Sequence, residues 1–254
     1  RWVERDGVRL HALDSIERAD PSLVPLVFLP GFGEEALDHL GLIELLLPRL
    51  VVVPDLRGRG PSDAPAAGYT LADHVGDLGA VVDAAGLDVV HVASYSRGTA
   101  YALGWALDHP DRVRSVAVGD YTAAHLVPPP GTVDLFVGQR RGGRPVTDRM
   151  SAATMAAVFA DAVAEDYHDG LARLPAPLLV VRGGRRSSLV SDAAVARYRS
   201  ARPDVVVEVL ADSGHDLWWP DPTAFPRLLA CFAEQADEAE QGAQSVSEWR
   251  RRGA

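Results

Sequence analysis

The segment DVVHVASYSRGTAYALGWALDH, residues 88–109, constrains the fold of this chain more than any other. Its apolar run 89–93 predicts a strand buried on both faces, and small or apolar residues recur at helical spacing from Ala100 to Leu107. No loop separates the two, so the turn at 94–98 has to lead directly from strand into helix. Such a turn strains the backbone of Ser96 and exposes its hydroxyl at a helix N-terminus. The segment predicts a nucleophile at Ser96, with a serine that only caps the helix as the alternative.

Strands alternate with helices through most of the chain. Further apolar runs that predict buried strands lie at 24–29, 50–53, 113–118, 178–181 and 205–210. The alternation predicts a mostly parallel, doubly wound sheet, in which functional loops lie beyond the C-terminal ends of the strands. An Asp6-Gly7 pair between two short segments with strand patterns predicts an antiparallel hairpin at one edge.

Residues 122–174 break the alternation with a proline-rich stretch and a helical pattern around Met155–Val163. Because this segment lies between two strands, we expect it to form a small lid over the C-terminal edge of the sheet. The predicted organisation is therefore a core domain in two parts, 1–121 and 175–236, with the lid at 122–174 between them. A polar tail at 237–254 completes the chain, and we expect its first half to prolong a helix and its end to be loose.

Composition restricts the class of protein. The formal net charge of −10 argues against a nucleic-acid surface, and no apolar run approaches the roughly 18 residues of a membrane span. The first residues do not have the pattern of a signal peptide. The single cysteine, Cys231, excludes an internal disulfide and is predicted to be buried within an apolar helical pattern. We expect a cytoplasmic protein with a small-molecule partner, no metal and no cofactor, and a homodimer is left open.

Four segments of the chain, in this order, resemble the α/β-hydrolase fold family. They are Pro30-Gly31-Phe32-Gly33, DLRGRGPSD at 55–63, Ser94-Tyr95-Ser96-Arg97-Gly98 and Asp212-Ser213-Gly214-His215. The second is close to the D-x-R-G-x-G-x-S-D signature. The resemblance covers nearly the whole chain and implies a mostly parallel eight-stranded sheet, with a small helical lid inserted after the sixth strand. It is specific to the fold and says much less about the substrate.

The resemblance also implies a serine-nucleophile mechanism. Ser96 would attack an acyl carbon and His215 would take its proton, because a free serine is a poor nucleophile at neutral pH. Of the eight histidines, His215 alone follows the last strand in an S-G-H setting. The backbone N–H groups of Phe32 and Arg97 would form the oxyanion hole. Many relatives have histidine before the first glycine of that loop, where this chain has Pro30.

The third member of the triad is where the sequence departs from the family. Relatives usually place an aspartate where this chain has Ser188, and a serine cannot stabilise an imidazolium by charge. Some relatives take the acid from the end of the sixth strand, where this chain has Asp120. Turn capping is the alternative role for Asp120, Asp192 is a weaker candidate for the acid, and a dyad without an acid stays open.

The leading hypothesis is therefore a serine hydrolase of a small-molecule ester, lactone or thioester, and a carboxylic-ester hydrolase in particular. The missing acid at Ser188 keeps two alternatives open: a cyclase, lyase or isomerase of a biosynthetic pathway, and a catalytically silent ligand receptor. Arg97 and the arginines at 140–144 are candidates for attracting an anionic substrate, against the alternative of solvated surface arginines.

Overall fold

Eight strands pair into one sheet in the order β1-β2-β4-β3-β5-β6-β11-β12, in a computed structural model that describes the backbone of residues 1–252 and the side chains of residues 1–242. The strands are β1 (Trp2–Arg5), β2 (Val8–Asp14), β3 (Leu26–Leu29), β4 (Val51–Asp55), β5 (Val90–Tyr95), β6 (Val113–Gly119), β11 (Leu178–Gly183) and β12 (Val206–Leu210). β1 and β2 pair antiparallel with each other and β2 with β4, whereas the other neighbours are parallel. The predicted fold class is confirmed, and the hairpin turns at Asp6 and Gly7, both with positive φ.

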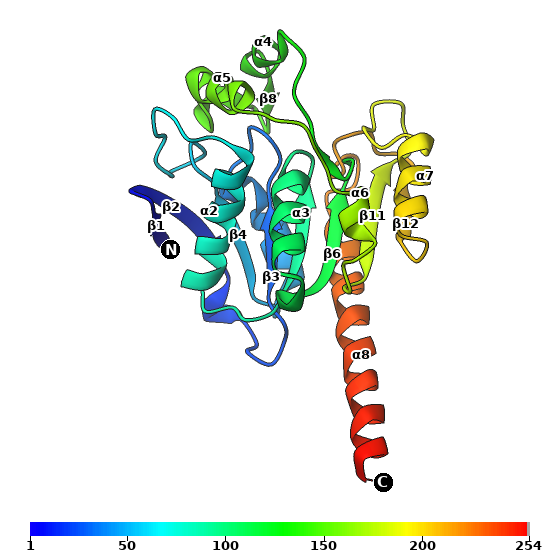
Figure 1. Ribbon diagram of the computed structural model, residues 1–254. Helices are drawn as coiled ribbons and strands as arrows, with labels where there is room; N and C mark the ends of the chain where they lie inside the picture. Colours follow the sequence, from blue (N-terminus) through cyan, green and yellow to red (C-terminus); the bar gives the residue numbers. More distant parts are fainter. Residues whose placement is uncertain (253–254) are drawn as a thin grey trace.

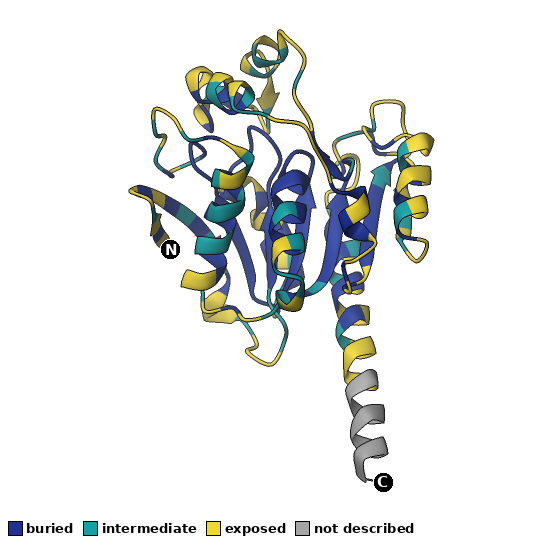
Figure 2. Ribbon diagram, viewed as in Figure 1, coloured by how far each residue is buried: buried dark blue, intermediate teal, exposed yellow. Residues whose placement is uncertain are grey.

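Helices cover both faces of this sheet (Figure 1). The helices of the core are α1 (Leu40–Leu46), α2 (Leu71–Ala84), α3 (Gly98–Asp108), α7 (Asp192–Ala201) and α8 (Ala224–Arg252), with short 3-10 turns at Ile16–Arg18, Ala36–His39 and Pro110–Arg112. Val27 and Leu29 of β3 belong to the apolar core under α2, α3 and α7, whereas Leu26 and Phe28 belong to the core under α1 and α8. Both faces of the strand are therefore buried, as Figure 2 shows, which explains its unbroken apolar sequence.

The segment between β6 and β11 carries the insertion. Its elements are β7 (Ala124–His125), α4 (Thr132–Val137), β8 (Arg140–Arg141), β9 (Arg144–Pro145), a 3-10 turn (Val146–Asp148), α5 (Ala152–Ala160), β10 (Glu165–Asp166) and α6 (His168–Leu171). α4, α5 and β8 lie at the top of the view in Figure 1, above the C-terminal ends of the strands, and α6 lies lower, beside the sheet. A separate apolar cluster joins Met155 and Val158 of α5 to Phe32 of the body.

The C-terminal helix α8 packs Phe225, Leu229 and Phe232 against the sheet. Cys231 is exposed, so the prediction that it fills the core is wrong. Successive residues of a helix point about 100° apart, and Cys231 faces away from the apolar stripe of α8. The first half of the tail prolongs a helix, as predicted, but α8 continues to Arg252, so most of the end that was expected to be loose is helical as well. Residues 253–254 and the side chains beyond 242 lie outside the described residues. No helix within residues 1–252 is long and apolar enough to cross a membrane.

Gly98 lets the start of α3, just after Ser96, approach the C-terminal end of β3 closely. A Cβ atom on Gly98 would lie 2.4 Å from the carbonyl oxygen of Pro30 and 2.6 Å from that of Leu29. Because both atoms belong to the backbone of a central strand or its end, Gly98→Ala is expected to lower the free energy of unfolding by about 1–3 kcal/mol, measured by urea denaturation.

Gly41→Ala is the matched control for this substitution. Gly41 lies within α1, and a Cβ there would have nothing within 4 Å. It is expected to raise the free energy of unfolding by about 0.5–1 kcal/mol, because glycine loses more backbone entropy than alanine in a helix. Equal effects of the two substitutions would contradict the steric explanation.

Candidate active site

Ser96 occupies a strained turn between β5 and α3. Its φ is +51°, in the left-handed region that residues other than glycine rarely adopt, and its N–H donates to the carbonyl oxygen of Gly119 at 2.8 Å. The Oγ of Ser94, the first small residue of the turn, lies 3.1 Å from Oγ1 of Thr99 and braces the turn from within. The backbone at Ser96 therefore has the geometry that its local sequence predicts.

His215 stands directly beside this serine. Its Nε2 lies 3.0 Å from Ser96 Oγ, although 119 positions separate the two residues in the chain. The imidazole stacks on the ring of Tyr95 with centroids 5.0 Å apart, and the Tyr95 hydroxyl donates to the carbonyl oxygen of His215 at 2.8 Å. Burial raises the pKa of Tyr95, so this hydroxyl stays a donor at neutral pH. Tyr95 therefore holds the loop as well as the ring.

Asp120 lies on the other side of the imidazole. Its Oδ2 is 2.8 Å from His215 Nδ1, and the residue is fully buried immediately after β6. Its φ is +45°, a second left-handed residue at the end of a central strand. A hydrogen bond from Nδ1–H to this carboxylate leaves Nε2 free to accept the proton of Ser96. The three side chains thus form one hydrogen-bonded chain from hydroxyl to carboxylate.

Ser188 belongs to the surroundings of that carboxylate. Its Oγ donates to Asp120 Oδ1 at 2.5 Å, and the backbone N–H groups of Gly183 and Leu189 donate at 3.2 and 2.9 Å. The position where relatives place an aspartate therefore holds a donor to the aspartate on the neighbouring strand. Sequence reasoning treated Ser188 only as a missing acid and did not find this contact. Asp192 lies at the start of α7, largely exposed and paired with Arg182, and has no contact with His215.

Two backbone N–H groups lie free at the same site. Among the described residues, the N–H groups of Phe32 and Arg97 have no hydrogen-bond acceptor, while the neighbouring Gly31 N–H donates to Glu34 Oε2 at 2.6 Å. Buried backbone donors are almost always paired. Two unpaired donors beside Ser96 are thus available for a substrate oxygen.

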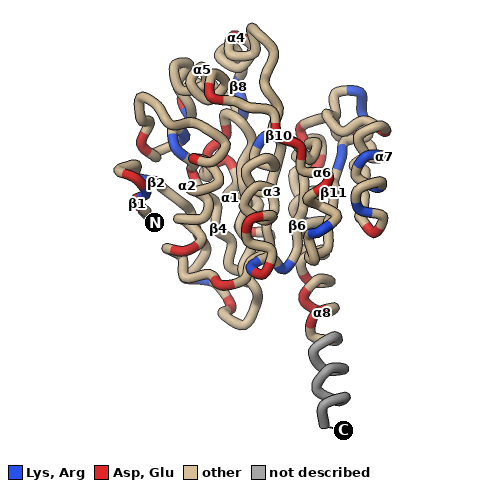
Figure 3. The backbone as a smooth tube through the Cα atoms, viewed as in Figure 1, with Lys and Arg blue, Asp and Glu red and all other residues tan. Residues whose placement is uncertain are grey.

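Three ion pairs tie the loop after β3 to the insertion. They join Glu34 to Arg141, Glu35 to Arg144 and Asp38 to Arg149. Figure 3 shows acidic and basic residues interspersed along the described chain, including the region of β8. Glu34 is buried and also accepts the Gly31 N–H, so Arg141 supports the loop that carries Phe32. Arg141 and Arg144 are therefore occupied by carboxylates of the chain itself.

A cavity of about 590 Å³ opens at Ser96. Ser96, Arg97, Phe32 and His215 line it together with side chains that are mostly apolar: Tyr121, Leu126, Val127, Pro128, Pro129, Thr132, Phe136, Phe159 and Leu189. Most of these apolar residues belong to the insertion. Such a lining suits the apolar part of a small organic ligand. His215 also lines a second cavity of about 510 Å³, together with Arg140, Arg141 and Arg185.

These observations agree with comparisons with known proteins. Residues 24–141 match a family model described as alpha/beta hydrolase fold. The solved structure of Est816, described as an N-acyl homoserine lactone degrading enzyme, aligns with 91% of this chain and 100% of its own, with a TM-score of 0.72 and 26% identity. The chain has the α/β-hydrolase fold.

Two curated relatives cover most of the chain. The dihydrolipoyllysine-residue acetyltransferase component of the acetoin cleaving system of Cupriavidus necator is 27% identical over 248 residues, 85% of this chain and 64% of its own length. The chain thus spans somewhat less than two thirds of that relative. The 2-(acetamidomethylene)succinate hydrolase of Mesorhizobium japonicum is 26% identical over 202 residues, 65% of this chain and 71% of its own. Shorter matches include an epoxide hydrolase and a haloalkane dehalogenase.

The segment 55–63, which resembles the α/β-hydrolase signature, has a structural role, and none of its residues lines the cavity at Ser96. Asp55 accepts hydrogen bonds from Ala36 N–H at 2.7 Å and faces His11 Nδ1 at 2.7 Å. Arg57 pairs with Asp77 inside the protein, with nitrogen–oxygen distances of 2.6 and 2.8 Å. The segment that matches the family signature most closely therefore holds the loops around the site. Its residues make no hydrogen bond to Ser96, His215 or Asp120.

Arg97, the residue after Ser96, joins the insertion to the turn between β5 and α3. The buried guanidinium donates to Tyr101 Oη at 3.2 Å, to Leu126 O at 2.9 Å and to His125 Nε2 at 2.7 Å. His125 donates in turn from Nδ1 to Val163 O at 2.6 Å. Burial, and then the charge of Arg97, lower the pKa of His125 to about 4, so this ring is neutral at pH 7. His125 thus contacts Arg97 and not the cavity, and His168 pairs with Asp166 away from it.

A pH dependence of stability follows from these histidines. Burial also lowers the pKa of His39 and His91 to about 4, whereas the unfolded chain takes up protons at about 6.5. The unfolded state therefore binds more protons between these values, and stability is lost as the pH falls from about 6.5 towards 4. Between pH 7 and 5 each buried histidine is expected to cost about 1–2 kcal/mol of unfolding free energy, measured by urea denaturation.

The variant His125→Gln isolates the contribution of one buried histidine to this pH dependence of stability. Glutamine can accept from Arg97 and donate to Val163, as the neutral ring does, but it does not titrate. The loss of stability between pH 7 and 5 is expected to be smaller in this variant than in the wild type. Equal losses would show that His125 is not held neutral.

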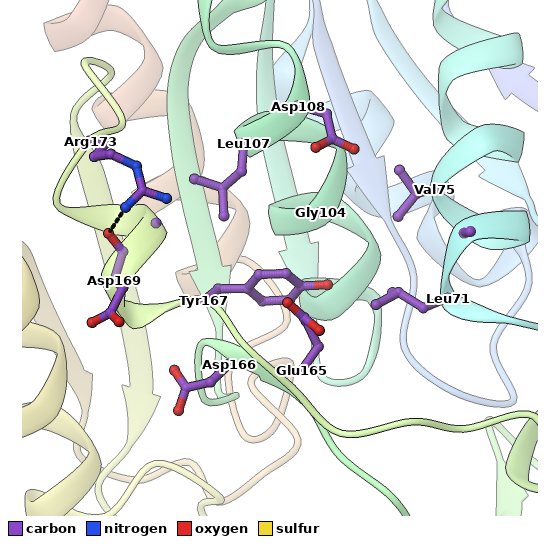
Figure 4. A pocket seen from close by; sticks show the side chains of 12 residues that line it. Leu71, Val75, Gly104, Leu107, Asp108, Glu165, Asp166, Tyr167, Asp169 and Arg173 are labelled. Carbon is purple, nitrogen blue, oxygen red and sulfur yellow. Dashed lines mark hydrogen bonds between the residues drawn. The ribbon is translucent and has the colours of Figure 1, made fainter.

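A further cavity lies elsewhere in the molecule, and Ser96, His215 and Asp120 do not line it. It has a volume of about 540 Å³ and lies between α2, α3 and the end of the insertion, lined by Leu71, Val75, Leu107 and Tyr167 among others (Figure 4). Among the described residues, no three His, Cys, Asp or Glu side chains are placed to hold a metal ion.

Proposed function

We propose that this chain is a serine hydrolase of a small-molecule ester, lactone or thioester, and that it forms an acyl-enzyme at Ser96. The observation that carries the proposal is the unbroken hydrogen-bonded chain from Ser96 through His215 to Asp120, at 3.0 and 2.8 Å, at the mouth of an apolar cavity. A nucleophile, a base and an acid that orients the base are the groups that acyl transfer requires.

In the first half of the proposed reaction, Ser96 Oγ attacks the carbonyl carbon and His215 Nε2 accepts the hydroxyl proton. The carbonyl oxygen becomes an oxyanion, which accepts hydrogen bonds from the N–H groups of Phe32 and Arg97. When this intermediate collapses, the bond to the leaving oxygen or sulfur breaks, and His215 returns its proton to the leaving atom. An ester then joins the acyl group to Ser96. The alcohol or thiol is released, or, for a lactone, the new hydroxyl stays on the acyl group.

The second half of the reaction repeats these steps with water. His215 takes a proton from a water molecule whose oxygen attacks the acyl carbon, and the same two N–H groups hold the oxyanion. Collapse breaks the bond to Ser96 Oγ, which regains its proton from His215, and a carboxylic acid leaves. Asp120 stays ionised throughout and stabilises the imidazolium that forms twice in the cycle.

The position of Asp120 favours hydrolysis over the two alternatives. Both the non-hydrolytic enzyme and the silent receptor were motivated by the absence of an acid at Ser188, and the hydrogen bond from His215 to Asp120 removes that motive. The names of relatives point in the same direction, since they include a lactone-degrading enzyme and a succinate-derivative hydrolase. A carboxylic ester is the substrate that the apolar cavity and the two free N–H groups suit best.

The insertion is proposed as the lid of this enzyme. Leu126 and Val127 at its start and Phe136 and Phe159 of its helices line the cavity opposite Ser96, where they would exclude water from the acyl group. A cytoplasmic location and the open question of a homodimer stay predictions of the sequence.

A fluorophosphonate probe tests the proposal directly. Such a reagent phosphonylates a serine only when a base activates it. The intact mass is expected to rise by one adduct, and peptide mapping is expected to place the adduct on Ser96. Ser96→Ala is expected to stay unlabelled under the same conditions. An unchanged mass of the wild type would reject a serine-hydrolase function.

A further inference from the structure

Buried arginines in this protein are normally neutralised by a carboxylate. The described residues include six buried arginines: Arg49, Arg57, Arg59, Arg97, Arg149 and Arg202. Four of them pair with an aspartate at 3.0 Å or less. Arg59 and Arg97 have no carboxylate oxygen within 4 Å among the described residues. Of these two, only Arg97 lines the cavity at Ser96.

Every group that holds the Arg97 guanidinium is neutral. Its acceptors are the Tyr101 hydroxyl, the Leu126 carbonyl oxygen and the His125 ring, which the lowered pKa keeps uncharged at pH 7. Tyr121 also contacts it, and the charge lies 5.5 Å from the centroid of the Phe159 ring. These partners use at most four of the five guanidinium N–H groups. At least one N–H is left for a ligand.

An uncompensated cation in such a place is costly. A buried charge that lacks a counter-ion loses its hydration without an ion pair in return, and only 5% of Arg97 is exposed. Tyr121, Leu126 and Phe159, which surround the guanidinium, all line the cavity. The charge is therefore at the wall of the cavity, where an anion on a bound molecule would supply the missing partner.

We propose that the natural substrate is an ester, lactone or thioester that carries a carboxylate, and that this carboxylate pairs with Arg97 inside the cavity. The inference rests on the proposed function, since it names the substrate class of the same site. A carboxylate fits better than a phosphate, because Arg97 is the only arginine among the described residues that lines the cavity, the chain has no lysine, and the rest of the lining is mostly apolar. The guanidinium is fixed before the substrate arrives, which favours selectivity.

Matched esters measure the preference. Phenyl hexanoate and monophenyl adipate have acyl chains of equal length, which end in a methyl group in the first and in a carboxylate in the second. A further ester, with the carboxylate on the alcohol part, is compared with phenyl hexanoate in the same way. After correction for spontaneous hydrolysis, kcat/KM for one of the carboxylate esters is expected to exceed that of the neutral ester by about tenfold or more. Equal or lower values for both carboxylate esters would overturn the proposal.

Arg97→Gln removes the charge and keeps hydrogen-bonding groups. The readout is the ratio of kcat/KM for the carboxylate ester to kcat/KM for the neutral ester, measured within one variant. A general loss of activity from a displaced loop does not affect this ratio. The ratio is expected to fall by about tenfold in Arg97→Gln and to be largely restored in Arg97→Lys. Arg59→Gln is the matched control, because Arg59 is buried, has no carboxylate partner among the described residues and does not line the cavity, and it is expected to leave the ratio unchanged. An unchanged ratio in Arg97→Gln would overturn the proposal.

Binding to Ser96→Ala separates this proposal from the proposed function. Calorimetry is expected to show that monomethyl adipate binds at least about tenfold more tightly than methyl hexanoate, without any turnover. If the wild type hydrolyses neither ester while this selectivity is present, the hydrolase function fails and the carboxylate site stands. If neutral esters are hydrolysed and no selectivity is found in binding, the carboxylate site fails and the hydrolase stands.

Discussion

Replacing Ser96 by alanine is expected to lower kcat/KM for an ester substrate by about 10⁴-fold or more. The hydroxyl oxygen is the atom that the proposed mechanism joins to the acyl carbon, and no other hydroxyl lies within hydrogen-bond distance of His215 Nε2 among the described residues. The remaining activity would come from the two free N–H groups and from binding alone. Initial rates with an aryl ester, measured at several substrate concentrations, would give the ratio.

The fold of this variant has to be verified separately, because Ser96 has a φ of +51° and alanine tolerates that region less well than glycine. Ser96→Gly, which relieves the strain but also removes the hydroxyl, is the control. Both variants are expected to unfold near the wild-type urea concentration and to be equally inactive. Substantial ester turnover by either variant would place the nucleophile elsewhere or make the chemistry non-covalent.

Asp120→Asn is expected to lower kcat by about 10⁴-fold, the size of the effect when a buried triad aspartate becomes an amide in a serine protease. The amide can accept a hydrogen bond from His215 Nδ1, but it cannot stabilise the imidazolium, and it can equally present its NH₂ group and favour the wrong tautomer. The carboxylate also accepts from Ser188 Oγ and Leu189 N–H, so part of the loss would come from a disturbed β11 loop. A stopped or discontinuous rate assay over the pH range 6–9 would measure it.

The double variant Asp120→Asn, Ser188→Asp distinguishes the role of the charge from that of the loop. Ser188 touches Asp120 and occupies the position where relatives carry the acid, so an aspartate there returns one carboxylate to the neighbourhood of His215. We expect the double variant to recover at least about tenfold of the lost kcat, since one pKa unit of imidazolium stabilisation corresponds to that factor. Ser188→Asp alone, which places two carboxylates together, is expected to be slower than the wild type. Unimpaired catalysis by Asp120→Asn would instead support the dyad without an acid.

Local patterns in the sequence were sufficient for much of the fold. The six strands with a predicted range, β3 to β6, β11 and β12, lie within two residues of it, because runs such as 26–29 are apolar on both faces and permit no other burial. The hairpin followed from Asp6-Gly7, and the turn after β5 followed from the lack of any loop before Ala100. The error at Cys231 has a different cause, since the apolar stripe of α8 is wide enough to include it and only packing decides which side faces the sheet.

The candidate site, too, was predictable from local sequence only in part. The position of Ser96 at a turn depends on five adjacent residues, and the structure places it as the motif predicts. Its distance to His215 depended on the family resemblance, because nothing in the residues between them encodes 3.0 Å. The ion pairs from Glu34, Glu35 and Asp38 to the insertion had no signal in the sequence at all, since arginine clusters read equally well as solvated surface.

The sequence by itself determined the order of strands and helices along the chain and the turn at Ser96, and its family resemblance gave His215 and Asp120 as candidates for the base and the acid. Tertiary structure alone decided that Asp120 reaches His215, that Ser188 donates to Asp120, and that Arg97 faces the cavity with no carboxylate beside it. The physical reason is the range of the interactions. Hydrophobic periodicity and turn strain act over a few consecutive residues, whereas a hydrogen bond or an ion pair depends on the register of strands that are far apart along the chain.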